Sequence, residues 1–87
     1  MNATDRGRRR AELIALLSET VPDIDDTLGA NEPLVSSGRV NSLALFRLAL
    51  WIEEQTSQPI DFTRIDIGEA WDTTDRILDF LERIREI

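Results

Sequence analysis

The sequence predicts an all-α protein, a small four-helix bundle of three main helices and a short third helix, with a long loop after the first. Apolar residues recur at spacings of three and four in three separate segments, which is typical of helices with one buried face. No segment alternates apolar and polar residues as a half-buried strand would. The 87 residues, 41% of them apolar, fit a single compact domain, which we assign to residues 10–87.

The first helix is predicted from Arg10 to Val21. Its buried face is marked by Leu13, Ile14, Leu17 and Val21. Four of the ten arginines gather just before it, at positions 6, 8, 9 and 10. Positive charges at a helix N-terminus oppose the helix dipole, at roughly 0.3–1 kcal/mol each. We therefore expect residues 1–9 to form a frayed, solvated basic tail.

Pro22 ends this pattern, and a loop of about twenty residues leads to Val40. Loops of that length in compact domains usually carry function or short structure of their own. The second helix is predicted from Ser42 to Gln55, with Asn41 or Ser42 capping its first amides. Its wide buried face consists of Ala44, Leu45, Leu48, Ala49, Trp51 and Ile52.

A separate apolar stripe lies on another side of this helix. Leu43, Phe46 and Leu50 share that side, bordered by Arg47 and Glu54. Apolar side chains bordered by charges are typical of a surface for a partner. A competing interpretation packs Phe46 and Leu50 in the core against the long loop.

The remainder of the chain holds a short helix and a long one. After an extended link at residues 59–62, residues 63–70 are expected to form one or two helical turns, with Ile65 and Ile67 facing the core. Cap residues at positions 72–74 then precede the last helix. The apolar face of that helix is formed by Ile77, Leu78, Leu81, Ile84 and Ile87.

The composition removes most catalytic chemistry. The chain has no cysteine, histidine or tyrosine, and its ten basic residues are all arginine. Thiol nucleophiles, imidazole bases, lysine Schiff bases and metal sites built on Cys or His are therefore excluded. Trp51 and Trp71 stand on apolar faces and are expected in the core. The acid pairs Asp25–Asp26 and Glu53–Glu54 read as surface charge, so we expect neither an enzyme nor a metal protein.

The charge and hydropathy of the chain exclude some classes of binding partner. A net charge of −7 would repel a phosphate backbone, so nucleic-acid binding is not expected. No apolar run approaches the roughly 20 residues that span a bilayer, and the N-terminus is charged where a signal peptide is apolar. We expect a cytoplasmic monomer with an acidic surface and no membrane partner.

One segment carries a family resemblance. Residues 34–43 read LVSSGRVNSL, and this arrangement of Leu, Gly and Ser-Leu before the second helix resembles that of acyl and peptidyl carrier proteins. The resemblance continues through the apolar helix, Pro59–Phe62 and Trp71–Thr74, and covers roughly residues 13–84. The serine motif is weak alone and gains its value from the spacing to the other features. The resemblance implies a bundle of acyl-carrier type.

The resemblance also implies a function. Ser42 would carry 4'-phosphopantetheine, a covalent cofactor that a phosphopantetheinyl transferase attaches from coenzyme A. The thiol of that arm would hold an acyl or aminoacyl group as a thioester and present it to ligase and transferase enzymes, in fatty acid or secondary-metabolite biosynthesis. A helix N-terminus favours a nearby phosphodiester in any case. The competing interpretation of Ser42 is a plain helix cap.

The sequence departs from the family pattern at two positions. Asn41 replaces the acid that usually precedes the serine, which removes a charge that could pair with a basic transferase surface. Arg47 stands where fatty-acid carriers tend to be acidic, so we expect a specialised pathway and a partner surface with some acidic groups. The expected partner-binding residues are Arg39, Asn41, Leu43, Phe46, Arg47, Leu50 and Glu54. The alternative is an unmodified module whose second helix binds a partner helix.

Overall fold

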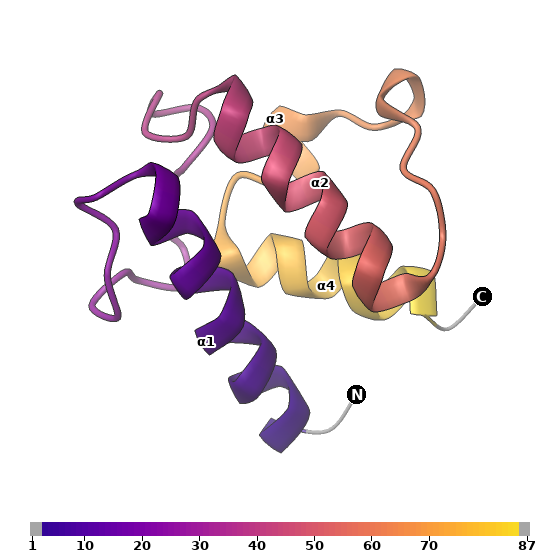
Figure 1. Cartoon of the computed structure of the whole chain (residues 1–87), viewed down its shortest axis with the longest axis horizontal. Helices are drawn as coiled ribbons and strands as arrows, with labels where there is room; N and C mark the ends of the chain where they lie inside the picture. The colour runs from indigo at the N-terminus through magenta and orange to yellow at the C-terminus, as the bar shows by residue number, and fades with distance from the viewer. Residues whose placement is uncertain (1–2, 86–87) are drawn as a thin grey trace.

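The computed structural model describes residues 3–85, which form four α-helices, one 3-10 turn and no strand. Helix α1 spans Ala3–Thr20, α2 Ser42–Thr56, α3 Ile67–Ala70 and α4 Thr74–Arg85, and the 3-10 turn η1 spans Phe62–Arg64. Helices α1, α2 and α4 contact one another pairwise, and α3 contacts α4. Figure 1 shows the loop 21–41 on one side of this bundle and the link 57–66 on the other. The expectation of a small all-helical bundle is confirmed.

The core lies where the three long helices meet, and Trp71 is fully buried in it. The Trp71 ring makes an edge-to-face contact with Phe80 of α4, with ring centroids 5.6 Å apart. The predicted buried face of α2 is confirmed, with Leu45 alone of that set half-buried. Helices α1, α2 and α4 thus bury most of the face that their apolar spacing predicted, with Ile14 and Ile84 half-buried, and Trp51 and Trp71 belong to the core.

Helix α1 begins at Ala3, seven residues before the predicted start at Arg10. The structure thus has residues 3–9 in a helix where the sequence predicted a frayed tail, and residues 1–2 lie outside the described residues. The reason is the side chain of Arg6, whose guanidinium lies 3.1 Å from a carboxylate oxygen of Asp79 and 3.0 Å from one of Glu82. A third carboxylate, on Asp75, lies 3.5 Å away. Ion pairs to α4 thus offset the unfavourable helix dipole.

We expect Arg6→Gln to lower the free energy of unfolding by about 1 kcal/mol, because Arg6 is partly exposed and its ion pairs are partly screened. Urea unfolding followed by circular dichroism measures this loss. Arg8→Gln is the matched control, since Arg8 is at the same helix end and its ion pair among the described residues is within its own helix, with Asp5 at 3.6 Å. The control should change stability by less than about 0.5 kcal/mol. Equal losses in both variants would contradict the role assigned to Arg6.

The loop 21–41 has no regular secondary structure, yet it belongs to the core. Five apolar residues spread along it are buried: Val21, Ile24, Leu28, Leu34 and Val40. Backbone hydrogen bonds close turns within it, such as that from Ile24 N–H to the carbonyl of Val21 at 3.0 Å. The side chain of Arg10 donates to the Leu28 carbonyl from α1. The loop is therefore an ordered part of the domain and contributes side chains to its core.

The chain after α2 follows the prediction with one difference: the segment predicted to hold one or two helical turns is divided into the 3-10 turn η1 and the single turn of α3. Ile65 and Ile67 are half-buried against the core, as expected. The Thr73 hydroxyl accepts a hydrogen bond from Arg76 N–H at 3.1 Å, so it caps α4. Ile87, placed by the sequence on the face of the last helix, lies outside the described residues.

Candidate functional site

The start of α2 presents an exposed serine. Asn41 is the cap of this helix: its side-chain oxygen accepts a hydrogen bond from Ala44 N–H at 2.9 Å, and its backbone is extended. Ser42 is the first helical residue, its side chain is exposed, and its hydroxyl makes no hydrogen bond within residues 3–85. The interpretation of Ser42 as the helix cap is therefore wrong, because Asn41 fills that role.

The electrostatics at this helix end favour an anion. The first turn of α2 contains no acidic residue, so no carboxylate of that turn compensates the positive end of the helix dipole. The N–H groups of the first turn point out of the helix end, and the cap residue satisfies one of them. A phosphate group bonded to Ser42 Oγ would lie next to these amides.

The predicted apolar stripe is exposed. Leu43 is 58% exposed, Phe46 57% and Leu50 46%, and these three are the exposed large hydrophobic residues of the described chain. The interpretation that packed Phe46 and Leu50 against the long loop is therefore wrong. A hollow of about 200 Å³ between α1 and α2 continues this surface, and Leu50 lines it together with Leu16 and Trp51.

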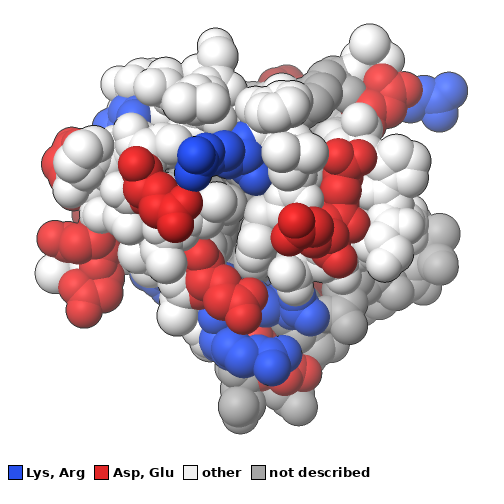
Figure 2. Space-filling view, in the orientation of Figure 1, with Lys and Arg blue, Asp and Glu red and all other residues white. Residues whose placement is uncertain are grey.

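The arginines near the stripe are paired within the chain. The guanidinium of Arg47 lies 2.9 Å from a carboxylate oxygen of Glu19, and that of Arg39 lies 3.2 Å from one of Glu32. Glu54, in contrast, makes no ion pair with any described residue. The positive charge expected to select an acidic partner is thus already compensated. Figure 2 shows the same interleaving of acidic and basic groups over α1 and α2, with basic groups gathered over the N-terminal part of α1.

Asp72, just before α4, makes hydrogen bonds to the loop that precedes Ser42. One oxygen of its carboxylate accepts hydrogen bonds from Val35 N–H at 2.9 Å and Ser36 N–H at 2.8 Å. The other oxygen accepts from the Ser36 hydroxyl at 2.9 Å, and the backbone carbonyl of Asp72 accepts from Leu34 N–H at 2.6 Å. These donors, the Ser36 N–H foremost, hold the pKa of Asp72 below its ordinary value of 3.8.

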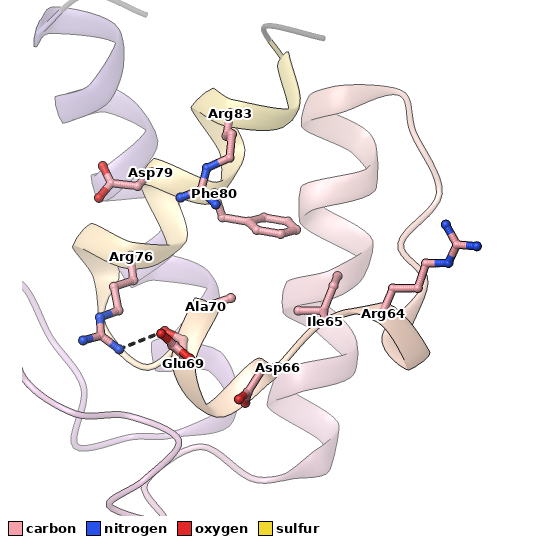
Figure 3. Close-up of a pocket in the computed structure, with 9 residues that line it drawn as sticks. All are labelled: Arg64, Ile65, Asp66, Glu69, Ala70, Arg76, Asp79, Phe80 and Arg83. Carbon is pink, nitrogen blue, oxygen red and sulfur yellow. Dashed lines mark hydrogen bonds between the residues drawn. The ribbon is translucent and has the colours of Figure 1, made fainter.

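A cleft of about 500 Å³ lies between the η1–α3 segment and α4 (Figure 3). Phe80 projects from α4 toward Ile65 across it, and the Arg76 guanidinium donates to the Glu69 carbonyl at 3.0 Å. Acidic and basic side chains both line the cleft, with Asp66, Glu69 and Asp79 among the acids and Arg76 and Arg83 among the bases. It therefore offers apolar contact and charges of both signs.

Sequence reasoning placed the serine, the cap and the stripe, and the structure brings all three together at α2. It missed the contact between Asp72 and residues 35–36, although Asp72 stood out as a cap residue. The sequence contains both partners of this contact, the Asp72 carboxylate and a Ser-Ser-Gly segment with backbone N–H donors. No local pattern predicts that residues 36 positions apart form a pair.

Among residues 3–85, no helix combines the length and apolar character needed to cross a membrane. In the same range, no group of three or more acidic side chains is placed to hold a metal ion. Comparison of the sequence with protein-family models gives no match, and comparison with curated proteins gives no similar sequence. The function must therefore be inferred from the side chains around the start of α2.

Proposed function

We propose that this protein is a carrier of acyl-carrier type, modified at Ser42 with 4'-phosphopantetheine, which holds an acyl or aminoacyl group as a thioester. One observation carries the proposal most: the exposed hydroxyl of Ser42 lies in the first turn of α2, on the helix that also presents Leu43, Phe46 and Leu50. A modifiable group and a docking surface thus stand on one rigid element. The carried group and the partner enzyme would meet there.

The attachment chemistry needs only a hydroxyl from this chain. The Ser42 oxygen bonds to the phosphorus that carries the pantetheine arm in coenzyme A, and the pyrophosphate bond to the adenosine bisphosphate breaks. The hydroxyl proton leaves to a base of the transferase, because the chain has no histidine to take it. Asn41 leaves the hydroxyl free by capping the helix itself, and the uncompensated dipole favours the resulting phosphodiester.

The exposed stripe supplies the surface for the transferase and for the enzymes that load and unload the arm. Its three residues lie within about 100° of Ser42 around the helix axis. A partner that covers Leu43, Phe46 and Leu50 therefore faces the serine. A few residues contribute most of the binding energy at protein interfaces, where aromatic side chains are enriched, and Phe46 is the aromatic anchor that this stripe offers.

Asn41 favours a specialised pathway under this proposal. An amide caps the helix as an aspartate would but brings no charge to the transferase. We therefore infer a transferase, and a loading ligase, that tolerate a neutral residue before the serine. The intramolecular pairs of Arg39 and Arg47 leave Glu54 as a charge beside the stripe that makes no ion pair among residues 3–85.

The second candidate is an unmodified interaction module. The same stripe would bind a partner helix in that case, and Asn41 is the residue that favours it, since carrier families usually have an acid there. In such a module Ser42 would be an ordinary exposed residue. The two candidate functions differ in whether 4'-phosphopantetheine is attached to Ser42.

Intact mass spectrometry distinguishes them, after incubation of the purified chain with coenzyme A and a broad-specificity phosphopantetheinyl transferase. We expect one added arm on the wild type and none on Ser42→Ala. Ser57→Gly is the matched control, because Ser57 is an exposed serine with a left-handed backbone at the opposite end of α2, and this variant should be modified like the wild type.

The contrary result is that neither the wild type nor Asn41→Asp gains an arm. That result would favour the interaction module. Modification of Asn41→Asp alone would mean that the broad-specificity enzyme needs the acid. The carrier proposal would then require a dedicated transferase.

A further inference from the structure

The segment that leads into Ser42 is held at one end by Asp72. Residues 35–38 form exposed turns containing two serines and Gly38, whose φ of +78° is left-handed. Their other hydrogen bonds are local, such as that from the Ser37 hydroxyl to the Pro33 carbonyl at 2.7 Å. The contacts of Asp72 therefore connect this segment to the α3–α4 junction.

A continuous path of contacts runs from Asp72 to Ser42. The carbonyl of Asp72 accepts from Leu34 N–H at 2.6 Å, and the carbonyl of Leu34 accepts from Val40 N–H at 3.2 Å. Leu34 and Val40 are both buried in the core. Val40 is followed directly by Asn41, the helix cap, and then by Ser42. The backbone before the serine is thus fixed at both ends of the 34–40 turn.

A transferase must bring the Ser42 oxygen into line with a phosphorus atom, and catalysis of this kind is sensitive to misplacement of about 1 Å. Fixing a loop in one conformation costs roughly 1–2 kcal/mol for each residue whose backbone is ordered. A loop already ordered in the free protein spares the transferase that cost. The hydrogen bonds of Asp72 order it before binding.

We propose that Asp72 is a positioning residue for the modification of Ser42, because it holds the 34–40 turn in the conformation that the transferase recognises. This inference rests on the proposed carrier function. If loss of the carboxylate leaves about a tenth of the molecules competent, the KM for the carrier rises about tenfold. The kcat stays near the wild-type value, because the few competent molecules react normally once bound.

The experiment measures transferase kinetics with each chain as the substrate. We expect Asp72→Ala to raise KM about tenfold, and Ser36→Ala, which removes only the hydroxyl contact, to raise it about two- to threefold. Asp72→Asn should rescue most of the loss, since its amide oxygen can still accept from Val35 and Ser36 N–H.

Asp61→Ala is the matched control. The Asp61 carboxylate also accepts from a backbone N–H at 3.0 Å and a hydroxyl at 2.6 Å, but both belong to Thr63 in its own turn. It should leave KM unchanged. Circular dichroism and urea unfolding confirm that each variant is folded under assay conditions, and amide hydrogen exchange at residues 35 and 36 reports the turn directly.

The outcomes separate the two proposals. A modified wild type with the same KM for Asp72→Ala and Asp61→Ala would overturn the role of Asp72 and leave the carrier function intact. If Asp72→Ala does not fold, Ser36→Ala decides, and a wild-type KM for Ser36→Ala would overturn the role of Asp72. A wild type that no transferase modifies would overturn the carrier function and this role with it.

Discussion

Trp71→Ala should remove about 3–5 kcal/mol of the free energy of unfolding. Trp71 is fully buried, belongs to the core cluster and packs edge-to-face on Phe80. Truncation leaves a cavity at the junction of α3 and α4, where the surrounding helices cannot collapse fully. A domain of 87 residues has roughly 5–15 kcal/mol in total, so the variant should lose a large share of its stability.

Urea unfolding followed by circular dichroism measures this effect, and Trp51 remains as a fluorescence probe in the variant. Leu43→Ala is the control, because Leu43 is a large apolar residue that is 58% exposed. It should change stability by less than about 1 kcal/mol. A loss below about 1 kcal/mol in Trp71→Ala would contradict the packing described for the core.

Phe46→Ser should lower the kcat/KM of the transferase about tenfold or more while leaving the fold intact. The Phe46 side chain is 57% exposed, so its loss from the free protein costs little core packing. Buried at an interface, an aromatic anchor is typically worth 2 kcal/mol or more, and 1.4 kcal/mol is already tenfold. Steady-state kinetics of modification measure the change.

Arg64→Ser is the control for this variant, since Arg64 is a long, highly exposed side chain that lies outside the stripe. Its kcat/KM should match the wild type. Equal rates for Phe46→Ser and Arg64→Ser would show that the stripe does not contact the transferase. Urea unfolding of both variants excludes a loss of fold as the cause.

The sequence was sufficient wherever a local pattern determines the structure. The spacing of apolar residues placed α2 within one residue of its end, separated Leu48 on the buried face from Phe46 on the exposed one, and set Trp71 in the core. Asn41 and Ser42 were both candidates for the cap. Only the extended backbone at Asn41 and its contact with Ala44 N–H decide between them.

The features that sequence reasoning missed depend on residues far apart in the chain. The early start of α1 is stabilised by contacts of Arg6 with α4, which lies at the opposite end of the chain in sequence. The order of the 34–40 turn depends on Asp72 in the same way. The helix-dipole rule disfavours positive charges at a helix start, but tertiary ion pairs of Arg6 outweigh this effect.

The most direct test of the carrier assignment is the mass of the protein isolated from its own cells, with fragmentation to locate any added group. A carrier should be isolated with 4'-phosphopantetheine on Ser42 and on no other residue, with part of the population bearing a thioester that hydroxylamine releases. A chain isolated intact with an unmodified Ser42 under conditions in which the partner enzymes are made would contradict the carrier assignment.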